Sequence, residues 1–118
     1  MKYTILHNNR CSKSRLGIEN IEASGKEVEV RYYLENPLNF DELVILQKKL
    51  WTKAIEFTRT GEGEFLEAEL TRESSDEEIL RAIEKYPKLL ERPIVYNETE
   101  AVVGRPPENI INFMKKKV

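Results

Sequence analysis

Residues 2–33 read KYTILHNNRCSKSRLGIENIEASGKEVEVRYY, and this stretch decides the fold. Residues 2–6, whose apolar stretch runs from Tyr3 to Leu6, predict a short strand. Residues 12–24 carry apolar side chains at roughly helical spacing, and Gly25 is expected to end that helix. Residues 27–33 alternate charged and apolar side chains, which is typical of a half-buried strand. A strand–helix–strand unit of this kind predicts two parallel strands joined by a right-handed crossover.

The rest of the chain is predicted to be mostly helical before it returns to the sheet. Two capping signatures, Asn39 with Glu42 and Ser75 with Glu78, indicate where two helices begin. The predicted elements are helices at 40–50, 65–70 and 75–86, strands at 94–96 and 101–104, and a last helix at 108–116. The closing strand pair, joined by a short turn, should be antiparallel. The order predicts an α/β fold with a mixed four-stranded sheet flanked by helices.

Residues 51–57 connect two of these helices. Thr52 is expected to cap a further helical turn that runs through Phe57. Trp51 and Phe57 are expected to pack in the core or at its rim.

The composition narrows the class of protein. At 118 residues and 40% hydrophobic, the chain is predicted to form one domain, 1–118. Its net charge of −2 does not favour nucleic acid as a partner, and no apolar run approaches the roughly 20 residues of a membrane span. We expect a cytoplasmic location, since the first residues lack a signal-peptide core. One cysteine and one histidine are too few soft ligands for a zinc site, so no metal is expected.

Cys11, the only cysteine, falls at the start of the helix predicted at 12–24. Unpaired N–H groups and the helix dipole place partial positive charge there. Nearby groups that can stabilise a thiolate are Arg10, Lys13, Arg15, Ser12 and Ser14. These effects should lower the pKa of the thiol below its usual value of about 8.5. The same corner would also suit an oxyanion.

Two readings of this corner are open. Most free cysteines are buried and inert, but charged and hydroxyl neighbours on both sides favour a reactive Cys11. His7 either satisfies backbone groups or acts on Cys11, and the residues alone do not decide between the two.

A lone reactive cysteine limits the mechanism. Ser14 stands three residues after Cys11, which excludes a C-x-x-C disulfide cycle. An adduct on Cys11 could be resolved only by an external thiol, such as glutathione followed by a glutaredoxin, or by a partner protein.

Residues 7–15, HNNRCSKSR, resemble the H-N-P-x-C-x-x-S-R signature of the ArsC family, the glutaredoxin-coupled arsenate reductases. Asn9 stands where the family usually has proline. Four further segments resemble family motifs in the same order: YLENP at 33–37, RTGE at 59–62, ERPIV at 91–95 and GRPPE at 104–108. Five motifs in order make the resemblance specific.

The resemblance implies a thioredoxin-like fold with a helical insertion between the second and third strands. It also implies a cis peptide bond at Arg92–Pro93, beside the cysteine loop. The implied fold agrees with the order of helices and strands that was predicted from the residues alone.

The resemblance further implies an active site without a tightly bound cofactor. Its members would be the nucleophile Cys11, the thiolate stabilisers His7, Ser14 and Arg15, and the arsenate-binding arginines Arg59, Arg92 and Arg105. The thiolate would attack arsenate, glutathione would add as co-substrate, and a glutaredoxin would release arsenite. A planar guanidinium suits a tetrahedral oxyanion better than an ammonium group does.

Two other functions remain open. One is an Spx-like regulator that binds RNA polymerase, although Ser14 replaces the second cysteine usual in that group and the retained arginines favour an anion site. The other is a glutathione-linked thiol oxidoreductase with a substrate other than arsenate. The same thiolate and cationic pocket would serve that function equally well.

Overall fold

The computed structural model describes residues 2–8 and 11–115. Asn9, Arg10, the side chain of Lys13 and the predicted helix end at residue 116 lie outside the described part of the chain. In the described part, no helix is both long and apolar enough to cross a membrane.

The predicted order of elements is confirmed. The elements are β1 (Lys2–His7), α1 (Ser12–Ala23), β2 (Glu27–Tyr32), α2 (Phe40–Leu50), η1 (Ala54–Phe57), α3 (Gly63–Glu67), α4 (Asp76–Lys85), η2 (Pro87–Leu89), β3 (Ile94–Tyr96), β4 (Ala101–Val103) and α5 (Glu108–Lys115). The strands form one sheet in the order β2-β1-β3-β4. As expected, β1 and β2 are parallel, and β3 is antiparallel to both β1 and β4. The α/β class with a mixed four-stranded sheet and a helical insertion between β2 and β3 therefore holds.

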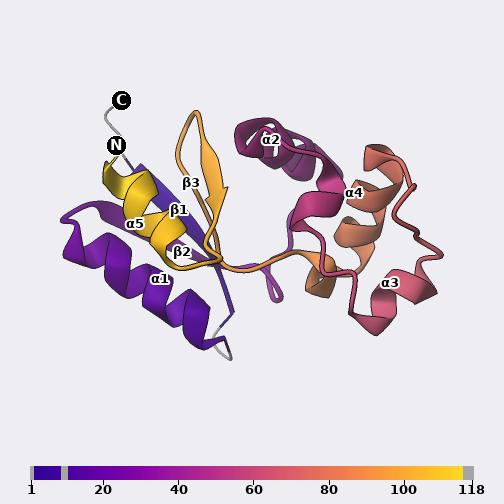
Figure 1. Cartoon of the computed structure of the whole chain (residues 1–118), viewed down its shortest axis with the longest axis horizontal. Coiled ribbons are helices and arrows are strands. Elements are labelled where there is room, and N and C mark those ends of the chain that lie inside the picture. Colours follow the sequence, from indigo (N-terminus) through magenta and orange to yellow (C-terminus); the bar gives the residue numbers. More distant parts are fainter. Residues whose placement is uncertain (1, 9–10, 116–118) are drawn as a thin grey trace.

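The sheet separates two apolar clusters. Figure 1 shows α1 and α5 beside the sheet at one end of the long axis, and α2, α3 and α4 grouped at the other. Successive side chains of a strand point to opposite faces, so Ile5 and Leu6 enter different clusters. Ile5 packs with the α1 and α5 side, among Ile21, Val95, Ile110 and Phe113. Leu6 packs with the helical insertion, among Leu43, Phe57, Ile79 and Ile94.

Both predicted capping signatures are present as capping boxes. Asn39 Oδ1 accepts from the Glu42 N–H at 2.9 Å, and the Asn39 N–H donates to Glu42 Oε1 at 3.0 Å. Ser75 and Glu78 exchange the equivalent pair at the start of α4. Each box satisfies two helix-end donors that would otherwise lack partners. These local bonds explain why the starts of α2 and α4 were readable from sequence.

The expectations for residues 51–57 were partly wrong. Trp51 adopts a left-handed conformation with φ of 58° at the end of α2, which turns the chain away, and its side chain is 86% exposed. The next helical turn starts at Ala54 after Lys53, so Thr52 does not cap it. Phe57 is fully buried, as expected.

The short helix predicted at 65–70 lies two to three residues earlier, as α3. Glu69 has a positive φ of 58°, and this conformation ends the helical run. Phe65 and Leu70 are both buried, so the apolar pattern correctly marked an inward-facing segment.

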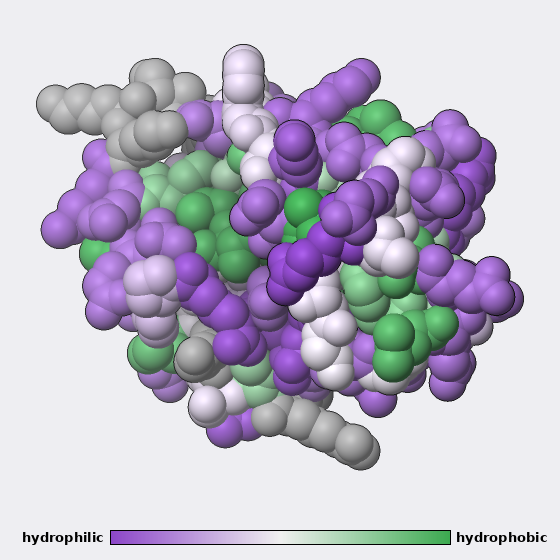
Figure 2. Space-filling view, turned by 45° about the vertical axis from the view of Figure 1, so that its right-hand side comes forward, coloured by the Kyte–Doolittle hydropathy of each residue, from purple (hydrophilic) through white to green (hydrophobic). Residues whose placement is uncertain are grey.

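Seven large apolar side chains of the described residues are exposed on the surface. The exposed large apolar side chains are Leu16, Tyr32, Leu34, Ile45, Trp51, Leu66 and Ile111. Figure 2 shows green areas separated by purple hydrophilic side chains on the face in view.

Gly104 allows α5 to pack closely against the start of β3. A Cβ atom at this position would lie 2.6 Å from Ile110 Cδ1 and 2.9 Å from Pro93 Cγ. The proline ring cannot rotate away, so Gly104→Ala should destabilise the fold by about 1–3 kcal/mol. Chemical denaturation would measure the free energy of unfolding.

Gly61→Ala is the matched control, because nothing lies within 4 Å of its added Cβ. It should leave the free energy of unfolding nearly unchanged. Equal midpoints for the two variants would contradict the close approach at Gly104.

Candidate active site

Cys11 is the N-cap residue of α1, at the position predicted for it. Its backbone is extended, with φ of −101° and ψ of 113°, and its N–H donates to Asn8 O at 2.9 Å. No side-chain hydrogen bond caps α1, and its first turn has no acidic residue. The side chain is only 8% exposed. The thiol therefore lies at the positive end of a helix dipole in a largely dry setting.

Arg105 reaches Cys11 from the loop between β4 and α5. Its Nη2 lies 3.7 Å from Cys11 Sγ, although 94 residues separate the two in the chain. Its Nε donates to Arg92 O at 2.5 Å, which fixes the direction of the guanidinium. A permanent positive charge held at this distance stabilises a thiolate.

Arg92 begins the segment that leads into β3. Burial alone would lower the pKa of Arg92, but hydrogen bonding to Cys11 and the charges of Tyr33 and Cys11 raise it above its usual value. Its side chain therefore lies beside both residues. The Arg92–Pro93 peptide bond is cis, as the resemblance implied, and so is the bond at Arg105–Pro106.

Arg59 lies at the outer side of the site, in the loop after η1. Its N–H donates to Leu89 O at 2.7 Å, which ties this loop to η2. Its Nη1 forms an ion pair of 2.8 Å with Glu62 Oε1. A cavity of about 380 Å³ opens here, lined by Thr58, Arg59, Thr60, Gly61, Glu62 and Glu91. An oxyanion that used Arg59 Nη1 would have to exchange with the Glu62 carboxylate.

Glu91 joins the three arginines, and the sequence analysis assigned it no role. Its Oε1 accepts from the Arg92 N–H at 3.1 Å and lies 3.3 Å from Arg105 Nε. The same oxygen lies 3.8 Å from Arg59 Nε. Glu91 thus engages the Nε groups of two arginines, while Nη1 of Arg59 pairs with Glu62 and Nη2 of Arg105 faces Cys11 Sγ. Only its adjacency to Arg92 could have signalled this, since the approach of Arg59 and Arg105 depends on tertiary packing.

Of the three expected thiolate stabilisers, Ser14 is placed most favourably. It is the third residue of α1, the position whose side chain faces back toward the N-cap. It is fully buried. His7 ends β1, is 3% exposed and packs edge-on against Tyr32 with ring centroids 5.5 Å apart. Arg15 is exposed on α1, and its N–H donates to Cys11 O at 3.2 Å.

Three buried donors mark the interior of this site. Among the described residues, Ser14 Oγ, Tyr33 Oη and Arg92 Nε donate to no acceptor. Tyr33 is the second residue that the sequence analysis left without a role, although it belongs to one of the quoted motifs. A buried donor without an acceptor costs about 1–3 kcal/mol. A ligand rich in acceptor oxygens, such as a tetrahedral oxyanion, fits this donor set.

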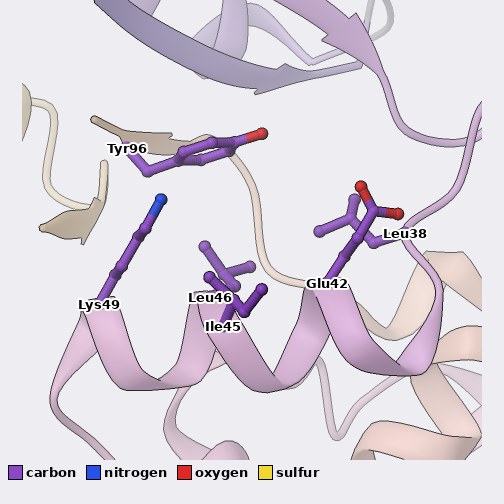
Figure 3. Close-up of a pocket in the computed structure, with 6 residues that line it drawn as sticks. All are labelled: Leu38, Glu42, Ile45, Leu46, Lys49 and Tyr96. Atoms are coloured by element: carbon purple, nitrogen blue, oxygen red, sulfur yellow. The ribbon is translucent and has the colours of Figure 1, made fainter. Parts of the chain in front are cut away.

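A second pocket lies between α2 and β3 but offers no comparable chemistry. Figure 3 shows Glu42, Ile45, Leu46 and Lys49 projecting from α2 toward Tyr96. The volume is about 160 Å³. Its charged groups are already engaged: Glu42 pairs with Arg31 at 2.7 Å, and Lys49 donates to Asn97 O at 2.8 Å. The surroundings of Cys11 are therefore the stronger candidate for an active site. No group of three or more potential metal-ligating side chains occurs in residues 2–8 and 11–115.

One family model and several known proteins match this chain. The family model of the ArsC family matches residues 6–113. An arsenate reductase of Neisseria meningitidis is 42% identical over 108 residues, covering 90% of this chain and 92% of that protein. The uncharacterised protein YfgD of Escherichia coli K12 is 40% identical over 112 residues, covering 93% and 94%. A solved structure of an arsenate reductase from Vibrio cholerae matches with a TM-score of 0.88 and 35% identity, covering 95% and 97%.

Proposed function

Because the chain belongs to the ArsC family and has its thioredoxin-like fold, we propose that it reduces arsenate to arsenite through a covalent adduct on Cys11. The observation that carries the proposal is the 3.7 Å contact of Arg105 Nη2 with Cys11 Sγ at an uncapped helix start. The names of similar proteins, arsenate reductases among them, supply the substrate.

Arsenate would bind over the first turn of α1. The free N–H groups of that turn suit an oxyanion, and guanidinium groups add charge-assisted hydrogen bonds. Arg92 and Arg105 lie beside the sulfur and would hold the inner oxygens. Arg59 would bind an outer oxygen after releasing Glu62.

In the first chemical step the Cys11 thiolate attacks arsenic. A sulfur–arsenic bond forms, and an arsenic–oxygen bond breaks with its electron pair remaining on the leaving oxygen. Arsenic stays pentavalent in this step. His7, Ser14 and Arg15 would favour the thiolate before attack.

Reduction then needs thiols from outside the chain, since Cys11 is its only cysteine. Glutathione displaces a second oxygen from arsenic. A glutaredoxin thiolate attacks the glutathione sulfur, forming a mixed disulfide and leaving two electrons on arsenic. Hydrolysis of the bond to Cys11 then releases arsenite and restores the thiol.

The test is direct detection of arsenite from the purified chain supplied with arsenate, glutathione and a glutaredoxin. We expect arsenite only in the complete mixture, because each thiol donor performs a separate step. Phosphate should slow the reaction by competing for the same arginines. No arsenite above the rate without protein would reject arsenate as substrate and favour another glutathione-linked reaction.

A further inference from the structure

Tyr33 leaves the sheet next to the segment that carries the nucleophile. The parallel register pairs Tyr32 of β2 with His7 of β1, so the residue after each strand lies at the same sheet edge. Tyr32, the last residue of β2, is 43% exposed, whereas Tyr33 begins the turn after the strand and packs in the cluster that contains Leu6. Tyr33 is accordingly 1% exposed, at the end of the sheet from which the chain continues to Cys11.

The hydroxyl of Tyr33 lies within electrostatic reach of the site. Burial raises the pKa of Tyr33 above its usual value. The charge of Arg92, a hydrogen bond with Arg92 and the charge of Arg59 oppose this shift, whereas the charge of Cys11 adds to it. The phenol is therefore protonated at neutral pH and offers a donor beside the sulfur and two arginines. In the described part of the chain its O–H has no acceptor, because the neighbouring Arg92 guanidinium can only donate a hydrogen bond.

Packing alone does not account for this hydroxyl. The ring of Tyr33 belongs to the cluster that includes Leu6, Leu38 and Ile94. A phenylalanine would fill the same space without burying a polar group that lacks a partner. An unpartnered buried donor next to a reactive sulfur is better explained by a ligand that accepts from it.

We propose that Tyr33 Oη donates a hydrogen bond to the oxyanion bound over Cys11 and gives its proton to the oxygen that leaves. The second part rests on the proposed arsenate reduction. As the sulfur–arsenic bond forms, the departing hydroxide takes the Tyr33 proton and leaves as water. The resulting tyrosinate regains a proton from solvent, so the step is balanced and involves no change in oxidation state.

The chemistry of the neighbouring groups supports this assignment. Hydroxide is a poor leaving group, and proton donation in the transition state typically contributes about 10²–10⁴-fold in rate. Arg59, Arg92 and Arg105 stabilise negative charge but cannot give up a proton in proteins. Their positive charges would also stabilise the tyrosinate formed after transfer.

The first experiment measures binding without turnover. Calorimetric titration of arsenate and of phosphate into Cys11→Ser is compared with the same titrations into Cys11→Ser/Tyr33→Phe. Loss of one hydrogen bond to a charged ligand should weaken both oxyanions by roughly tenfold or more. Equal affinities in the two proteins would overturn the donor role.

The second experiment measures turnover of the single variant Tyr33→Phe. We expect kcat to fall by about 10²-fold or more, beyond any loss in affinity, and the decline in rate at alkaline pH to disappear. Tyr32→Phe is the matched control, since it removes a hydroxyl from the exposed neighbour and should act like the wild type. An unchanged kcat in Tyr33→Phe would overturn the proton transfer.

The two experiments separate this inference from the proposed function. If the wild-type chain makes no arsenite, arsenate reduction fails and the proton transfer fails with it. The titrations still decide whether Tyr33 holds an oxyanion. Thermal melting of each variant shows that the comparison is made between folded proteins.

Discussion

Replacing Cys11 with serine is expected to abolish arsenate reduction, with a loss on the order of 10⁴-fold or more. A serine hydroxyl has no appreciable anionic form at neutral pH, even beside Arg105. The covalent adduct would not form, and no other cysteine in the chain can replace it.

The same substitution should leave the fold and the anion site in place. Serine is a preferred N-cap residue, so α1 should begin at the same position and be at least as stable. The variant should therefore form no arsenite but keep the melting temperature of the wild type. Arsenite production by folded Cys11→Ser at the wild-type rate would place the nucleophile elsewhere.

Replacing Arg105 with lysine should lower kcat/KM by about 10²–10³-fold although the charge is kept. Arg105 uses Nε for Arg92 O and Glu91, and Nη2 for Cys11 Sγ. A single ammonium group cannot hold these positions together. The rate of thiolate alkylation should fall as well, which tests the contact with sulfur independently of arsenate.

Arg72→Lys is the matched control for this change. Arg72 is exposed in the turn before α4 and lies outside the site, so its replacement should leave kcat/KM unchanged. If Arg105→Lys and Arg72→Lys behaved alike, charge alone would suffice and the fixed geometry of Arg105 would have no catalytic value.

Local signals made much of the fold predictable. Asn39 with Glu42 and Ser75 with Glu78 form their bonds within four residues, so the sequence contains everything needed to recognise them. The alternation in β2 and the apolar run in β1 likewise reflect which side chains meet the core. By contrast, Trp51 has a left-handed backbone conformation at the end of α2 and its side chain is exposed. No signal in the neighbouring residues predicted that conformation.

Candidate site residues could be predicted where the residue type itself indicates the chemistry. Cys11 at a helix start is visible in the order of residues alone, and family motifs supplied the arginines. Glu91 and Tyr33 were missed for a different reason. Their importance comes from neighbours that lie 14 and 32 residues away from Glu91, and 22 to 59 residues away from Tyr33. Such neighbours are brought close only by the packing of the insertion against the sheet.

The carboxylates of Glu62 and Glu91 also affect how an anion would arrive. With Arg59 and Arg105 already paired at 2.8 Å and 3.3 Å, two of the three arginine charges are partly offset before an anion arrives. Diffusing anions would therefore gain less from electrostatic steering than three unpaired arginines would provide. Selection between different anions would then occur on contact, when an oxyanion displaces the Glu62 carboxylate from Arg59.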